Sequence, residues 1–225
     1  MKIITETYDL INNNGTVMNE EAKQRFREEA LKKIETCARE SHLSQDRATG
    51  APGKFVKKIV NLGHLSVLRH VQLTVHFIFS RGINIEMVRH QLAQPSPTQE
   101  STRFIKYDDT TVIDIAPAID LCNKTKDLSV HLKNALLTEW QEACEDAEKH
   151  YIRMLQLGAA PEIARSVLNN SLKAGIYLTA NLEEWMYILQ QRCSPQADPQ
   201  MREITRPLYF ELCDMFPEIF NGILK

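Results

Sequence analysis

The stretch from residue 71 to residue 79, VQLTVHFIF, constrains the fold more than any other part of the sequence. It alternates with period two, which is the pattern of a β-strand with one buried face. The apolar face consists of Val71, Leu73, Val75, Phe77 and Phe79. The opposite face consists of Gln72, Thr74, His76 and Ile78. This is the clearest strand in the chain, and its apolar face has to be covered by another layer of structure.

Most of the other apolar residues follow the spacing of amphipathic helices. We expect helices over residues 18–40, 54–64, 82–93, 128–158, 161–170, 182–192 and 199–216, and further short strands over 2–11, 101–107 and 111–116. Gly63 and Gly158 are predicted to end two of the helices, while Pro161 and Pro199 suit first helical turns. Because no repeat, low-complexity tract or linker interrupts this order, we predict a single domain, residues 1–225.

Composition narrows the class of protein. The chain has 225 residues, 43% of them hydrophobic and 25% charged, with a formal net charge of −2. Such a chain does not coat nucleic acid or an anionic membrane with its whole surface, so we expect neither partner. It contains no run of about 18 apolar residues and no signal-peptide core, which predicts a cytoplasmic protein. The five cysteines form no CxxC pair and are interpreted as reduced, non-catalytic thiols.

The histidines do not indicate a metal site. His64, His70 and His76 are spaced at equal intervals. If His70 and His76 lay on one strand, they would be ~20 Å apart, which is too far to share an ion. We therefore predict no metal and interpret these side chains as partly buried and hydrogen-bonded.

Arg192 is the most informative single residue. It follows Trp185 and Leu189 at helical spacing and is therefore predicted to face inward. A buried guanidinium is costly unless it is paired, either with a carboxylate in the core or with a ligand in a polar cavity. Spacing alone leaves both alternatives open.

A second group of polar residues lies in the stretch VRHQLAQPSPTQESTRF, residues 88–104. Glu86, Arg89 and His90 share one stripe of the helix expected over 82–93, so Arg89 and His90 are predicted to leave that helix together. Ser101 and Arg103 follow, and arginines with hydroxyl groups are what phosphate recognition requires. The sequence contains neither a glycine-rich phosphate loop nor a GxSxG motif.

Residues 89–104, RHQLAQPSPTQESTRF, resemble the signature of the flavin-dependent thymidylate synthases, in which an RHR triplet precedes a serine and an arginine, often as QESxR. The blocks TCARE, GHLSVLRH, GINIEMVRH and ARSVLNNSL, with Asn181 and Arg192, also occur in the order of that family. The similarity extends over about residues 36–202. It implies an α/β (α+β) fold with a central, mainly antiparallel sheet flanked by helices, in a homotetramer whose active sites are shared between subunits.

The resemblance also implies an activity. It is the reductive methylation of dUMP to dTMP, with FAD as bound redox cofactor and with NADPH and methylenetetrahydrofolate as cosubstrates. Because reduced flavin mediates carbon transfer in that family, no attacking cysteine is needed, which agrees with the interpretation of the thiols.

The family pattern assigns roles position by position. The FAD contacts are His70, Gln72, Arg89, His90, Gln91, Gln99, Asn181, Tyr187 and Gln196. The dUMP contacts are Glu86, Arg89, Gln99, Glu100, Ser101, Thr102, Arg103, Arg165 and Arg192. Arg192 is the implied catalytic residue, since a cation facing the uracil ring stabilises ionised N3 and enriches C5 as a nucleophile.

The chain departs from the family pattern at several positions. Gln91 stands where arginine is usual, and the loop before Ser101 is two residues longer than expected. Glu86 and Gln72 replace an expected amide and an expected small hydroxyl residue, and Glu183 stands where arginine is common. Two alternatives remain: a paralogue that modifies another pyrimidine nucleotide, for example by hydroxymethylation, and a decayed site that only binds nucleotide or flavin.

Overall fold

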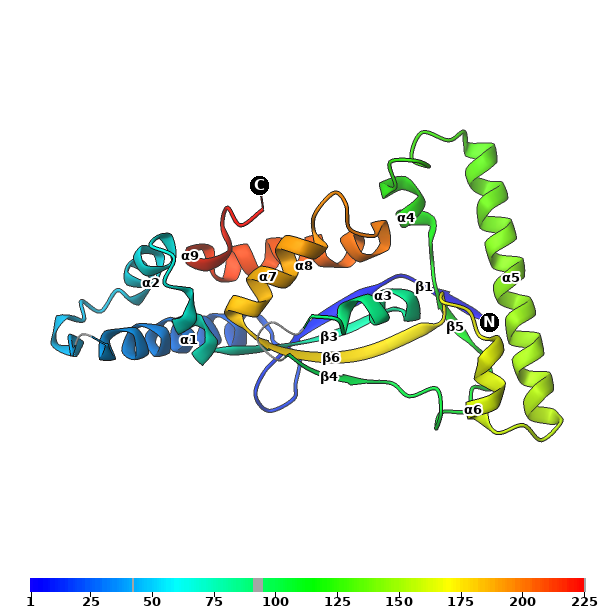
Figure 1. The fold of residues 1–225 in the computed structure, drawn as a ribbon, viewed down its shortest axis with the longest axis horizontal. Helices are drawn as coiled ribbons and strands as arrows, with labels where there is room; N and C mark the ends of the chain where they lie inside the picture. Colours follow the sequence, from blue (N-terminus) through cyan, green and yellow to red (C-terminus); the bar gives the residue numbers. More distant parts are fainter. Residues whose placement is uncertain (42, 91–94, 225) are drawn as a thin grey trace.

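A four-stranded antiparallel sheet forms the centre of the protein in the computed structural model, which describes residues 1–41, 43–90 and 95–224 (Figure 1). The strand order is β2 (Thr7–Ile11), β3 (Gln72–Ser80), β6 (Lys173–Asn181) and β4 (Ser96–Gln99). A separate parallel pair joins β1 (Lys2–Ile4) to β5 (Thr111–Ile113). The predicted fold class, with a mainly antiparallel sheet flanked by helices, is confirmed.

The alternation that predicted the central strand is realised in β3. Leu73, Val75, Phe77 and Phe79 are almost completely buried, whereas the residues between them are partly or fully exposed. Strand β6 pairs with β3 along its whole length, from Gln72 opposite Asn181 to Ser80 opposite Lys173. The sequence analysis missed β6, although Ala174, Ile176, Leu178 and Ala180 alternate in the same way and are buried.

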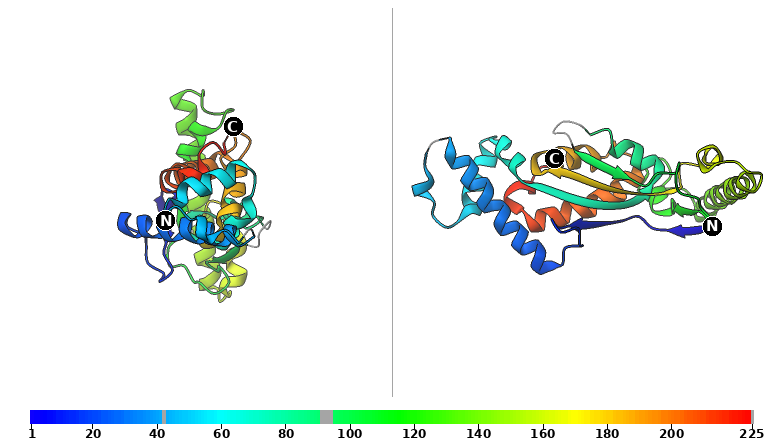
Figure 2. Two further views of the ribbon diagram at one scale, coloured as in Figure 1. Left: turned by 90° about the vertical axis from the view of Figure 1, so that its left-hand side faces the viewer. Right: turned by 90° about the horizontal axis from the view of Figure 1, so that it is seen from below.

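Helices cover the apolar face of the sheet and extend the molecule at both ends (Figures 1 and 2). The α-helices are α1 (Glu20–Glu40), α2 (Pro52–Asn61), α3 (Arg81–Met87), α4 (Ala116–Leu121), α5 (Val130–Gln156), α6 (Pro161–Ala164), α7 (Leu182–Arg192), α8 (Pro199–Met215) and α9 (Pro217–Phe220). The 3₁₀ helices are η1 (Gln45–Arg47), η2 (Leu65–His70) and η3 (Arg165–Val167). Figure 1 places α1, α2 and α9 at one end of the sheet and α5 with α6 at the other.

The buried core lies between the sheet and helices α1, α7 and α8. Trp185 of α7 is fully buried, and its indole Nε1 donates to the main-chain oxygen of Leu73 at 3.0 Å. This bond ties α7 to the central strand and thereby fixes the position of every later residue of the helix. No helix among the described residues is long and apolar enough to cross a membrane.

Several predicted elements are wrong. Residues 101–107 form a turn instead of a strand, because the main-chain N–H groups of Phe104 and Ile105 both donate to the oxygen of Ser101. The strand expected over 2–11 is interrupted between β1 and β2. Helices α3 and α6 end earlier than predicted, at Met87 and Ala164. Strand β4 and the short helices α4 and α9 were not predicted, since none carries a periodic apolar pattern of sufficient length.

The connection between β1 and β2 contains a carboxyl group that should limit stability at alkaline pH. Burial and, to a smaller extent, the negative charges of Glu203 and Asp198 together raise the pKa of Glu6 to about 9. Since an unfolded glutamate ionises near pH 4, the folded protein binds the extra proton, and stability falls as the pH rises from about 4.5 toward 9. We expect Glu6→Gln to increase the free energy of unfolding by ~1–3 kcal/mol near pH 8 and by much less near pH 4.5.

Urea unfolding of both proteins at the two pH values measures this effect. Glu139→Gln, a change of the same kind at an exposed position in the middle of α5, is the matched control and should leave stability unchanged at both. An equal gain at the two pH values would contradict the prediction, because it would show that ionisation of Glu6 is not its source.

Candidate active site

Arg192 ends α7 and faces inward, as its spacing predicts. Trp185, Ile188 and Leu189 on the same stripe are completely buried, while the Arg192 side chain is 18% exposed. The helix begins at Asn181, whose side-chain Oδ1 accepts a hydrogen bond from the main-chain N–H of Glu184 at 2.9 Å. A capped start and a buried stripe therefore position the guanidinium at the edge of the core.

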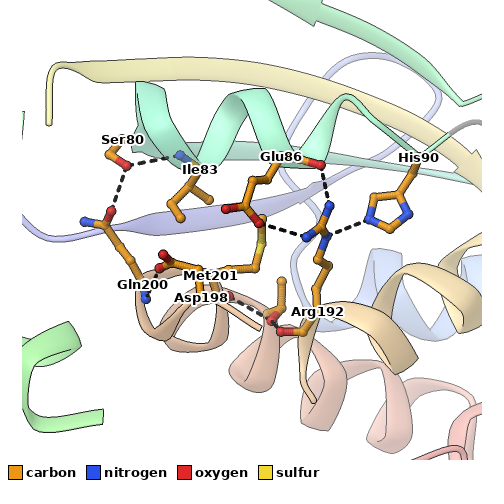
Figure 3. A network of polar contacts seen from close by, with 9 residues as sticks. Ser80, Ile83, Glu86, His90, Arg192, Asp198, Gln200 and Met201 are labelled. Atoms are coloured by element: carbon orange, nitrogen blue, oxygen red, sulfur yellow. Dashed lines mark hydrogen bonds and ion pairs between the residues drawn. The ribbon is translucent and has the colours of Figure 1, made fainter. Parts of the chain in front are cut away.

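Glu86 and His90 hold the guanidinium of Arg192 along its edge (Figure 3). Nη1 donates to Glu86 Oε2 at 2.8 Å, and Nη2 donates to the main-chain oxygen of Glu86 at 2.6 Å. Nε donates to His90 Nε2 at 2.7 Å. The guanidinium of Arg192 is therefore paired with a carboxylate, which was one of the two alternatives predicted from its helical spacing. Three hydrogen bonds fix its orientation.

His90 is held as a neutral ring. Burial and, to a smaller extent, the adjacent charge of Arg192 together lower its pKa to about 4. Because Nε2 accepts from Arg192, the ring proton is assigned to Nδ1. The ring also contacts Tyr187 of α7 edge to face, with 5.8 Å between the centroids.

The prediction that Arg89 and His90 leave one helix together is wrong. Helix α3 ends at Met87, after which the chain turns so that His90 is 7% exposed while Arg89 is on the surface. The buried face of α3 carries Ile83 and Met87, whereas Ile85 is exposed. The end of the helix separates two side chains that a continuous helix would keep on one stripe.

A cavity of about 540 Å³ lies beside Arg192. Its lining residues are Arg89, His90, Tyr187, Gln191, Arg192, Ser194, Gln196 and Ala197. Five of them were predicted site residues. The second alternative predicted for Arg192, a position beside a polar cavity, is therefore present as well. Gln191 and Ser194 were missed, because no periodic pattern distinguishes residues at the end of a helix and in the following turn.

Two predicted flavin residues lie in another cavity. His70 ends η2 and Gln72 begins β3, and both line a cavity of about 470 Å³ together with Lys33 and Arg69. Asn181 is the register partner of Gln72 across the sheet. His70 thus lies outside the strand that carries His76, contrary to the assumption that both share a strand face.

The residues predicted to bind the nucleotide phosphate gather around the turn after β4. Gln99 accepts a hydrogen bond from Asn84 Nδ2 at 2.6 Å, which ties the end of β4 to α3. Arg165 of η3 donates to Thr102 Oγ1 at 3.0 Å, and Arg103 Nη2 lies 3.8 Å from Glu162 Oε2. Both arginines therefore border the turn formed by residues 101–105.

Glu100 and Ser101 complete this second group. Glu100 accepts hydrogen bonds from Lys173 and Tyr107, two partners that the sequence analysis did not single out. Ser101 opens the turn with its main-chain oxygen. Gln91, the residue that replaces the usual arginine, lies outside the described residues.

The predicted residues thus form three groups: one around Arg192, one around His70 and Gln72, and one in the turn after β4. Their chemistry fits a flavin and a nucleotide. The two cavities offer aromatic and imidazole rings for a planar ring system, amides for its polar edge, and the cations Arg89, Arg69 and Lys33 for phosphate groups. The side chains at the two cavities are thus of the kinds that recognise planar, phosphate-bearing ligands.

Comparison with known proteins identifies the family. Residues 10–218 match the family described as "Thymidylate synthase complementing protein". Flavin-dependent thymidylate synthase from Mycobacteroides abscessus is 30% identical over 181 residues, which cover 77% of this chain and 70% of that protein. The enzyme of the same name from Clostridium tetani is 27% identical over 185 residues, covering 80% and 73% of the two chains.

A solved structure supports the fold. The crystal structure of the UMP/dUMP methylase PolB from Streptomyces cacaoi, bound with 5-Br dUMP, matches with a TM-score of 0.76 at 19% identity and covers 98% of this chain and 95% of that one. The chain belongs to the flavin-dependent thymidylate synthase family. It is accordingly an enzyme of the methyltransferase class with a flavin cofactor.

Proposed function

We propose that the protein converts dUMP to dTMP by reductive methylation, with methylenetetrahydrofolate as carbon donor, FAD as bound redox cofactor and NADPH as reductant. The observation that carries this proposal is the guanidinium of Arg192, held edge-on by Glu86 and His90 at the wall of the 540 Å³ cavity. A cation fixed in this way is suited to a planar imide whose N3 becomes negative during the reaction.

The role of Arg192 is electrostatic. When the uracil edge faces it, the guanidinium stabilises negative charge on N3, and the anionic ring withdraws less electron density from C5, which becomes the stronger nucleophile for the transferred carbon. The neutral ring of His90 keeps the guanidinium in place without adding a second positive charge. No thiol is required, in agreement with the interpretation of the cysteines as non-catalytic.

FAD would be held by the residues that the family pattern assigns to it: His70, Gln72, Arg89, His90, Gln91, Gln99, Asn181, Tyr187 and Gln196. When bound, the flavin supplies the redox chemistry and mediates carbon transfer. In the cavity beside Arg192, Tyr187 and His90 offer ring faces and edges, and the exposed guanidinium of Arg89 offers charge for a phosphate group.

The nucleotide would be held at two places. Glu86, Arg89 and Arg192 would face the base, while Gln99, Ser101, Thr102, Arg103 and Arg165 form the group proposed for the sugar and phosphate. Figure 1 places the end of α7 above the sheet next to α3, and places α6 beyond the end of the sheet beside α5. We therefore propose that base and phosphate groups of one site come from different subunits of a homotetramer.

One observation favours a second substrate. The partner of Arg192 is the carboxylate of Glu86, where an amide was expected. A carboxylate only accepts hydrogen bonds, so it suits an amino group on the pyrimidine ring better than a carbonyl oxygen. A paralogue acting on another pyrimidine nucleotide is the alternative that this residue supports, and the mass of the product distinguishes the two.

The complete assay with dUMP, methylenetetrahydrofolate, NADPH and FAD, with each component omitted in turn, tests the proposal. We expect yellow protein, anaerobic bleaching of the flavin by NADPH, and tritium release from C5-labelled dUMP only in the complete mixture. Colourless protein that FAD does not reconstitute would refute the proposed activity. A hydroxymethylated product, or turnover of another nucleotide in place of dUMP, would establish the paralogue.

A further inference from the structure

Glu100 lies at the start of the loop that carries Ser101, Thr102 and Arg103, but its carboxylate is bound by other parts of the protein. Oε1 accepts a hydrogen bond from the Tyr107 hydroxyl at 2.7 Å, and Oε2 accepts one from Lys173 Nζ. The Glu100 side chain is 16% exposed. Both oxygens therefore have partners within the chain, and the carboxylate holds the loop without any contact to a nucleotide.

These bonds close the loop at its base. The main-chain N–H of Glu100 donates to the oxygen of Gly175 at 3.0 Å, which extends the pairing of β4 with β6 by one residue. Tyr107 stands where the loop returns, and its own N–H donates to the Tyr151 hydroxyl at 3.2 Å. The hydrogen bond between Tyr107 and Glu100 therefore joins the two ends of residues 101–106. Burial and, to a smaller extent, this hydrogen bond raise the pKa of the Tyr107 hydroxyl. The hydroxyl therefore remains a donor at neutral pH.

Strand β6 leaves room for this arrangement at Gly175. A Cβ atom added there would lie 3.8 Å from Glu100 Oε2, 3.6 Å from His76 Nε2 and 3.3 Å from Ile78 Cδ1. A side chain longer than alanine would have to fit between Ile78, His76 and the carboxylate. Glycine in the middle of a strand costs stability, and close approach of another group is a common reason for it.

Lys173 also controls the charge beside the proposed phosphate site. An unpaired carboxylate next to Ser101 would repel a phosphate, whereas the ion pair with Lys173 has no net charge. With the pair intact, the cations of Arg103 and Arg165 determine the potential around the turn.

We propose that Glu100 is a positioning residue that fixes the shape of the loop 101–106 through Lys173 and Tyr107, and is not itself a ligand of the nucleotide. The expected consequence, tight binding of the nucleotide phosphate, rests on the proposed function. The closure of the loop is a property of the chain alone and is measured separately.

A double-mutant cycle in the FAD-reconstituted protein tests the role in binding. By calorimetry, we expect Lys173→Met and Glu100→Gln each to weaken dUMP binding by about 10-fold, and the double variant to bind no more weakly than either single variant. Lys57→Met, which removes an exposed charge on α2 outside the proposed site, is the matched control and should bind as the unmodified protein does. If Lys173→Met binds normally while both variants containing Glu100→Gln bind weakly, Glu100 is a direct ligand and the proposal is wrong.

Cleavage by chymotrypsin after Phe104 reports on the loop without nucleotide, since that ring is 78% exposed. Both single variants should be cut at least about 5-fold faster than the unmodified protein and the Lys57→Met control. Unchanged cleavage would overturn the proposed closure. Faster cleavage in a protein that binds no dUMP would retain the closure and would contradict only the proposed function.

Discussion

Arg192→Ala is expected to abolish turnover of dUMP, with a loss of at least about 10³-fold, while FAD stays bound. The guanidinium is the group that would stabilise charge on the base, and its removal leaves the carboxylate of Glu86 facing the same position. That negative charge opposes ionisation of N3, so the loss should exceed that of a single hydrogen-bond donor. Tritium release from C5-labelled dUMP measures the rate, and the flavin spectrum measures occupancy.

Arg192→Lys separates charge from geometry. An ammonium group keeps the positive charge but lacks the planar arrangement that contacts Glu86 and His90 together, so we expect it to restore only a small part of the activity. Arg25→Ala, at an exposed position on α1, controls for the loss of an arginine as such. Near-normal turnover by Arg192→Ala would refute the electrostatic role, and loss of bound FAD would show that Arg192 serves the cofactor instead.

Mixed tetramers of two inactive variants are expected to regain activity. If Arg192 and Arg165 of one site come from different subunits, a tetramer assembled from Arg192→Ala and Arg165→Ala subunits contains some sites with both arginines intact. If equal amounts of the two subunits assemble at random, about a quarter of all sites contain both arginines. Co-expression with two affinity tags, followed by sequential purification, provides the mixed species for the C5 tritium assay.

A pair of variants from the same group is the matched control. Arg192→Ala mixed with His90→Ala changes two residues that contact each other, so no assembly restores an intact site and activity should stay absent. Recovery to about a quarter in the first mixture but not in the second would establish sharing between subunits. If neither mixture recovers, one subunit supplies both arginines, and the proposed division of the site is wrong.

The candidate site was partly predictable. The inward position of Arg192 followed from the spacing of Trp185 and Leu189, because a helix that buries one stripe leaves little freedom to the residues on it. The separation of Arg89 from His90 was not predictable, since it depends on where α3 ends. That end is determined by packing against the sheet more than by local preference.

The sequence also did not reveal which residues far apart in the chain form hydrogen bonds with each other. Glu86 and Arg192 are more than a hundred residues apart, and so are His90 and Arg192. Lys173 pairs with Glu100 only because β6 lies beside β4, and β6 itself went unrecognised. Without that strand, neither the position of Gly175 nor the closure of the loop was foreseeable.

The sequence by itself determined the local elements with strong periodicity and the inventory of charged and polar residues in the family signature. Both depend on residues close together along the chain, where spacing specifies which side chains share a face. Only the tertiary structure decided which of those residues meet. It brought Arg192 and His90 to one cavity, paired Glu86 with Arg192, and left His70 and Gln72 in another cavity. The reason is that the sheet order and the ends of the helices arise from burial of apolar surface across the whole chain, and no short segment specifies that burial.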